Sequence, residues 1–209
     1  YWDTSFLDKA LALLKQLGQD RLLKDLVFGF YGFTGNRPLE WGAGGPARWP
    51  DSRPYNTPPG SQNQGGFRAF EWYADVIKSH LGETRPLLML AGGALPGDDA
   101  NPNLAVSPPI DAGGHAYCNS TIAKAMMERT LPSYVINVSF WLLAAENSPH
   151  APAAWRQSDG ATLPAVEALR QQVATAVQAV KGQPPEGSKT FRRLAGGDKP
   201  IYHYLLLTT

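Results

Sequence analysis

The connections between the apolar, strand-like segments of this chain are strongly asymmetric. The apolar runs are residues 27–31, 87–90 and 135–143. The segments that follow them are long and rich in Gly, Pro and Trp: 32–66, 91–119 and 144–162. The segments that lead into the second and third runs are short: 82–86 and 131–134. Connections in α/β units usually have only a few residues, and much longer ones are commonly functional or disordered. In parallel sheets ligands bind at the carboxyl ends of the strands, so we predict a site at that edge.

Segments with helical periodicity lie between the strand-like runs. The expected helices cover about 5–17, 20–25, 67–81, 120–130 and 163–180, and a last strand is expected over 201–207. This alternation predicts an α/β fold with a parallel sheet, either half of a barrel or a small open doubly wound sheet. We expect a barrel-like domain over 1–182, with a C-terminal extension over 183–209 that belongs to the same compact unit.

Composition excludes several functions. The net charge of +1, with 19 basic and 18 acidic residues well mixed, predicts neither nucleic-acid nor membrane-surface binding. A single cysteine excludes an internal disulfide, and the histidines show no metal-ligand spacing, so we expect no metal and no cofactor. The phosphate-binding glycine motifs and the Gly-x-Ser-x-Gly nucleophile motif are absent from the sequence, which argues against nucleotide binding and acyl transfer.

Three short motifs carry a family resemblance. They are PLLMLAGGA over 86–94, FWLLAAEN over 140–147 and WRQSDGATLPAVEAL over 155–169. Together they resemble the last two barrel strands and the tail of glycoside hydrolases of the (β/α)8-barrel, retaining, cellulase-like clan. The resemblance covers about residues 1–180 and implies the C-terminal half of a TIM-type barrel.

The resemblance also implies that the catalytic carboxylates are missing. The family's penultimate strand ends in apolar residues followed by a nucleophilic Glu and a Gly, and Ala91 stands at that nucleophile position. The family's acid/base residue lies on the fourth strand, which would precede Tyr1. Retaining hydrolysis needs two carboxyl groups about 5–5.5 Å apart. We therefore expect a catalytically degenerate or truncated barrel, a fragment of a larger protein.

Aromatic side chains are the main candidates for substrate contact, because ring faces stack on the apolar faces of sugars. The resemblance places Trp141 at a strand end as the floor of a sugar subsite, and Tyr31 ends the first strand. Trp41 either contributes to the same surface or anchors the long loop that contains it, and for Trp49 the anchoring interpretation is favoured.

Two polar residues complete the predicted site. Glu146 is a weak candidate for a replacement carboxylate and could accept a hydrogen bond from a sugar hydroxyl, but a role as a solvated loop residue or as a partner of Arg156 is favoured. His115 follows two glycines in an expected loop, where it could contact a sugar or be structural.

Three functions remain open at this point. The first is a degenerate hydrolase-like barrel that binds an oligo- or polysaccharide, and the second is a fragment of an active hydrolase. The third is a non-catalytic α/β interaction module or spacer, which requires buried aromatic residues. A half barrel would expose an apolar face, so we expect a homodimer or pairing with the missing upstream half. Polysaccharide-acting relatives are mostly exported, which suggests an extracellular or cell-envelope location.

Overall fold

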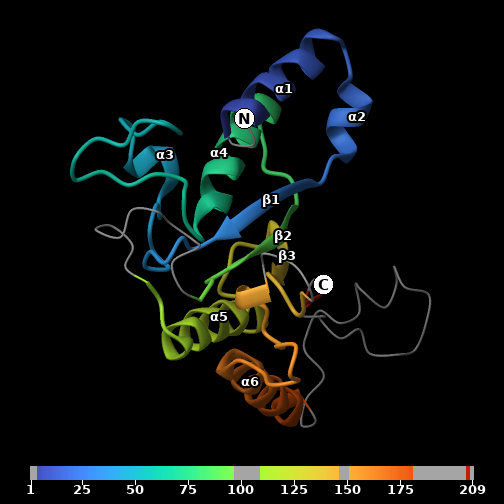
Figure 1. The fold of residues 1–209 in the computed structure, drawn as a ribbon. Helices are drawn as coiled ribbons and strands as arrows, with labels where there is room; N and C mark the ends of the chain where they lie inside the picture. The colour runs from blue at the N-terminus through green and yellow to red at the C-terminus, as the bar shows by residue number, and fades with distance from the viewer. Residues whose placement is uncertain (1–3, 97–108, 146–150, 181–205, 208–209) are drawn as a thin grey trace.

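The chain forms an α/β fold with a parallel sheet, as predicted. The computed structural model describes residues 4–96, 109–145, 151–180 and 206–207 (Figure 1). In chain order its elements are α1 (Thr4–Gln16), α2 (Asp20–Asp25), β1 (Phe28–Phe33), α3 (Gly45–Arg48), α4 (Ala69–Leu81), β2 (Leu87–Gly93), α5 (Ala112–Met127), β3 (Val135–Phe140), the 3₁₀ turn η1 (Ala151–Ala153), α6 (Pro164–Val180) and β4 (Leu206–Leu207).

The strands lie in the order β1-β2-β3-β4, and every pairing is parallel. The three longer strands form an open sheet in which Phe30 pairs with Met89, and Met89 with Val138. The two-residue β4 pairs with the end of β3. This pairing confirms the expected terminal strand for residues 206–207, whereas 201–205 lie outside the described residues.

Helices α4, α5 and α6 contribute to one hydrophobic core on one face of the sheet. That core includes Phe30, Met89 and Val138 from the strands and Phe70, Ile122 and Leu169 from the helices. Strand residues next to core positions are exposed, with Tyr31 at 60%, Leu90 at 48%, and Ile136 at 49% beside the core residue Val135, where the register of β2 and β3 shifts. Since side chains alternate between the faces of a strand, the helices cover one face and leave apolar residues exposed on the other.

The first helix packs on the fourth, next to β1 (Figure 1). Leu7 and Leu11 of α1 are buried, in keeping with their helical spacing, and belong to the same core as Ile77 of α4. His80 in the last turn of α4 contacts Asp8 of α1, with 2.7 Å between Nε2 and Oδ1. These contacts hold α1 against α4, the helix that precedes β2.

Several element boundaries differ from the prediction. β1 extends through Phe33, past its expected end at Tyr31, and β3 ends at Phe140 and not at residue 143. β2 continues through Gly93, so Ala91 lies inside the strand and not at a turn. Helix α5 begins at Ala112, eight residues before the expected start, because Asp111 caps it by accepting a hydrogen bond from the Gly114 amide at 2.7 Å. The adjacent glycines suggested a loop, but the Asp111 cap starts the helix there.

Candidate functional site at the carboxyl edge of the sheet

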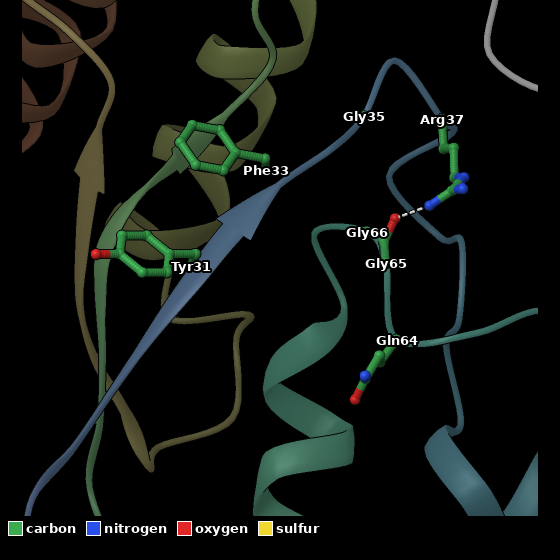
Figure 2. A pocket seen from close by; sticks show the side chains of 7 residues that line it. All are labelled: Tyr31, Phe33, Gly35, Arg37, Gln64, Gly65 and Gly66. Atoms are coloured by element: carbon green, nitrogen blue, oxygen red, sulfur yellow. Dashed lines mark hydrogen bonds between the residues drawn. The ribbon is translucent and has the colours of Figure 1, made fainter. Parts of the chain in front are cut away.

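An open cavity of about 370 Å³ lies at the carboxyl end of β1, at the predicted edge. Its lining combines two rings from the strand, an arginine from the following turn and a segment just before α4: Tyr31, Phe33, Gly35, Arg37, Gln64, Gly65 and Gly66. In Figure 2 the two rings lie on one side, and Arg37 reaches the Gly65 backbone on the other. Residues about 30 positions apart in sequence therefore share one site.

Three aromatic rings form a row along this edge. Tyr31 and Phe33 lie nearly parallel, with 6.3 Å between ring centroids and 9° between planes. Trp141 continues the row in an edge-to-face contact with Phe33 at 6.4 Å. The Trp141 amide donates to the Gly92 carbonyl of β2 at 3.1 Å, and the Trp141–Leu142 peptide bond is cis. The structure thus brings together two of the predicted substrate-contacting residues, Tyr31 and Trp141.

A tight turn after β1 positions Arg37. The Thr34 amide donates to the Gly93 carbonyl at 3.0 Å, and the Arg37 amide donates to the Thr34 carbonyl at 3.1 Å. Gly35 and Asn36, between them, both have φ of 56°. Gly and Asn are the residues that adopt this left-handed conformation most readily. The Thr-Gly-Asn-Arg sequence therefore dictates the turn that brings Arg37 back to the cavity.

The guanidinium of Arg37 is held on two sides. It lies over the Trp41 ring, 4.9 Å from the centroid, and its Nη1 donates to the Gly65 carbonyl. Its Nε is buried and has no hydrogen-bond partner among the described residues. Burial lowers the pKa of Arg37 from its ordinary value, but an arginine stays charged at any physiological pH. The cavity therefore contains a positioned, partly desolvated positive charge.

The tryptophans of the long loop hold the loop together. Trp41 Nε1 donates to Asn63 Oδ1 at 3.2 Å, and Trp49 Nε1 donates to the Ala43 carbonyl at 2.9 Å. Trp41 contacts Arg37 from below and does not line the cavity itself. Of the two roles considered for Trp41, the structure shows the anchoring one, and the ring supports the site through Arg37.

The predicted nucleophile position carries no acid. Ala91 is 4% exposed and pairs in register with Tyr31 across the β1–β2 ladder. This pairing puts Ala91 next to the strand that carries Tyr31 and Phe33. Glu146, the weak candidate for a replacement carboxylate, lies outside the described residues. None of the described side chains that line the cavity is a carboxylate.

His115 lies in a helix, and its expected place in a loop is wrong. It sits in the first turn of α5, fully buried, with its ring edge-to-face against Trp155 at 5.3 Å. Neither ring nitrogen makes a hydrogen bond of normal geometry to a described residue. Burial lowers the pKa of His115 to about 4, against a smaller opposing effect of the Ala94 backbone. His115 therefore belongs to the core and does not join Tyr31 and Trp141.

The sequence interpretation missed Arg37 and the segment 64–66 as parts of the site. Arg37 had a local signal, because it follows a Gly-Asn pair just after a strand. For Gly65 and Gly66 the only signal was their position before α4. Their approach to β1 depends on how the intervening loop folds, which no local pattern encodes.

No group of three or more His, Cys, Asp or Glu side chains in the described part could hold a metal ion. Within the same ranges, no helix combines the length and apolar character that crossing a bilayer requires.

Comparison with protein-family models, with curated proteins and with solved structures finds no match for this chain. The resemblance to the barrel glycoside hydrolases therefore stays a prediction that rests on the three motifs.

Proposed function

We propose that this chain binds carbohydrate at the carboxyl edge of its sheet, as a hydrolase-like domain without catalytic activity. The observation that carries the proposal is the row of Tyr31, Phe33 and Trp141 beside the Arg37 cavity. Flat rings next to a few directed polar groups are the combination by which pockets hold sugars.

The exposure of the rings supports a binding role. Tyr31 is 60% exposed on β1, the edge strand of the sheet, so a ligand can reach its ring. Phe33 and Trp141 are each half-buried and are joined by their edge-to-face contact. A row of this kind presents a continuous apolar surface that a sugar ring could cover.

The lack of a carboxylate supports a non-catalytic role. Ala91 has only a methyl group, which can neither attack an anomeric carbon nor stabilise an oxocarbenium ion. Glycoside hydrolysis with retention of configuration at the anomeric carbon requires two carboxyl groups about 5–5.5 Å apart. Hydrolysis with inversion requires two carboxyl groups that are somewhat farther apart. The described lining of the cavity provides none.

The arrangement of helices supports the half-barrel interpretation of the fold. In a (β/α)8 barrel every helix lies outside and the inner sheet face is filled by side chains, whereas a doubly wound sheet carries helices on both faces. Here the strand residues opposite the helix-covered face, such as Leu90 and Ile136, are exposed. We propose that the missing upstream half or a second copy covers them. Sedimentation velocity at micromolar concentration tests the second possibility, and a monodisperse monomer would argue against it.

The same exposed residues favour a second candidate function, a protein-interaction module. Apolar side chains such as Leu90 and Ile136 mark contact surfaces when they are contiguous. In that case Tyr31 would belong to a protein interface and not to a sugar platform.

A tryptophan-fluorescence titration with plant, fungal and bacterial cell-wall oligosaccharides separates the two candidates. For a ligand that gives a saturable change, Tyr31→Ala should raise Kd by roughly 5–30-fold, the effect of losing about 1–2 kcal/mol of ring stacking. Tyr117→Ala is the matched control, since Tyr117 is 69% exposed but lies on α5. If no sugar in the panel changes the fluorescence, the interaction module is the better account.

A further inference from the structure

We infer that the carbohydrate bound at this site is acidic, with a carboxylate or a sulfate ester on the sugar that pairs with Arg37. This inference rests on the proposed function and specifies its ligand class. The argument starts from a positive charge that the protein places in the cavity without a negative partner.

Arg37 differs from the other partly buried arginines of the described residues. Arg68 pairs with Glu71 at 2.6 Å, and Arg85 pairs with Glu83. For Arg37 no carboxylate of a described residue lies within ion-pair distance, and the described lining of its cavity contains no acid. A half-buried charge without a partner is costly, so a ligand that brings the opposite charge gains affinity there.

The guanidinium also presents a free hydrogen-bonding edge. Nη1 donates to the Gly65 carbonyl and Nε is buried out of reach of a ligand, whereas Nη2 has no hydrogen-bond partner among the described residues. Arginine binds oxyanions through two parallel N–H groups, and this geometry fits the two oxygens of a carboxylate or of a sulfate. A ligand oxyanion would therefore satisfy a donor that the protein leaves unpaired.

The local sequence holds this edge in place. A Cβ at Gly65 would lie 2.6 Å from Arg37 Nη1, so only glycine allows the guanidinium to approach the chain there. The Gly65 amide donates to Asn63 Oδ1 at 2.9 Å, and the same oxygen accepts from Trp41 Nε1. Asn63 thus links the Trp41 ring, over which Arg37 lies, to Gly65, whose carbonyl accepts from Arg37. A side chain held in this way loses little conformational freedom when a ligand binds.

The position of the charge relative to the rings suits a sugar. Tyr31, Phe33 and Arg37 line the same cavity, with the rings and the guanidinium on different sides (Figure 2). A pyranose that stacks on a ring can direct a substituent at its rim toward the arginine. Nucleic acid and polyphosphates are less suitable, because they are usually held by several cations, and Arg37 is the one cationic side chain in the described lining.

The test compares matched acidic and neutral ligands. Uronate oligosaccharides, among them oligogalacturonate and alginate fragments, are each titrated beside their carboxyl-reduced counterpart and beside a sulfated neutral oligosaccharide of equal length. We expect one acidic ligand to bind about tenfold more tightly than its neutral counterpart. Tighter binding by the uronate identifies carboxylate as the group, and tighter binding by the sulfated sugar identifies sulfate ester.

The variants Arg37→Gln and Arg48→Gln provide the matched pair. Arg48 also lies over a tryptophan of the same loop, 5.1 Å from the Trp49 ring centroid, but does not line the cavity. The preference for the acidic ligand should disappear in Arg37→Gln and persist in Arg48→Gln. In the unmodified chain, added NaCl should weaken binding of the acidic ligand and leave the neutral one unchanged, a readout that needs no variant.

The outcomes separate this inference from the proposed function. Equal binding of acidic and neutral ligands would overturn the acidic specificity and leave carbohydrate binding standing. A preference that persists in Arg37→Gln would overturn the assignment to Arg37. If no ligand of any pair binds, the carbohydrate function itself fails, and the inference fails with it.

Discussion

Protonation of His115 is expected to destabilise this chain at mildly acidic pH. The ring is fully buried between α5 and Trp155, and burial lowers its pKa to about 4. In the unfolded chain the ordinary value is about 6.5. Between these two values the unfolded state binds a proton that the folded state does not. Stability is therefore fully present above pH 6.5 and falls as the pH drops toward 4.

The size of the effect follows from the difference between the two pKa values. Each pKa unit corresponds to about 1.36 kcal/mol, so the whole loss is roughly 3 kcal/mol and most of it occurs above pH 4.5. That is a large share of the 5–15 kcal/mol typical of a folded domain. His115→Met keeps the volume of the side chain and removes the titration.

Urea unfolding at pH 7.5 and at pH 4.5 measures the effect. The original chain should lose roughly 2–3 kcal/mol more than His115→Met between these pH values, since other titrating groups contribute equally to both. Ile122→Val is the control: it removes a methyl from a fully buried residue of the same helix and should cost about 1 kcal/mol at both pH values. Identical pH dependence in His115→Met and the original chain would refute the reasoning, because the folded state would then accept the proton.

Three further substitutions test the edge and its supports, and a fourth, Gly160→Ala, is a control. Gly93→Ala should lower the free energy of unfolding by about 3 kcal/mol or more, because φ is 89° and a Cβ would lie 2.2 Å from Asn119 Oδ1. Gly160→Ala, with φ of 86° and no atom within 4 Å, should cost only about 1 kcal/mol. Thermal unfolding of the two glycine variants measures this difference. Asp111→Ala removes the cap of α5 and should cost about 1 kcal/mol by urea unfolding. Ala91→Glu should hydrolyse no aryl glycoside in a chromogenic assay, because the described lining offers no second carboxylate.

The elements with strong local signals could be predicted from the sequence. Helix α2 spans Asp20–Asp25 as expected, and α4 and α6 end where expected, α4 at Leu81 before the left-handed Gly82. The parallel order of the strands followed from the helices between them. These features depend on periodicity and on stop signals within a few residues.

The parts that failed depend on contacts between distant residues. His115 looked like a loop residue because two glycines precede it, yet Asn119, one turn later, hydrogen-bonds both the amide and the carbonyl of Ala94. That pair of contacts attaches α5 to the end of β2 and stabilises the early helix start. No pattern in the sequence around His115 indicates that the Asn119 side chain will hydrogen-bond the backbone of Ala94.

The location of the candidate site, at the carboxyl edge of the sheet, could be predicted from the sequence, but the set of side chains that line it could not. Trp141 lies at the carboxyl end of β3 as expected, whereas Tyr31, expected at the end of the first strand, lies two residues before the end of β1. The distance between the two rings depends on the register of three strands. Arg37 enters the cavity because the Gly35–Asn36 turn reverses the chain. Its orientation depends on Trp41 and on a carbonyl about 30 residues away.

The Ala-Gly-Gly segment at the end of β2 has a structural explanation that is independent of any catalytic ancestry. A Cβ at Gly92 would lie 2.6 Å from the Gly32 carbonyl oxygen, and one at Gly93 would meet Asn119 and Phe140. Both glycines are therefore required for β2 to approach β1 and α5 closely, whether or not a relative has a carboxylate nearby. The proposed carbohydrate binding therefore depends on the three rings and Arg37, whose exposure and charge the packing of the sheet does not require.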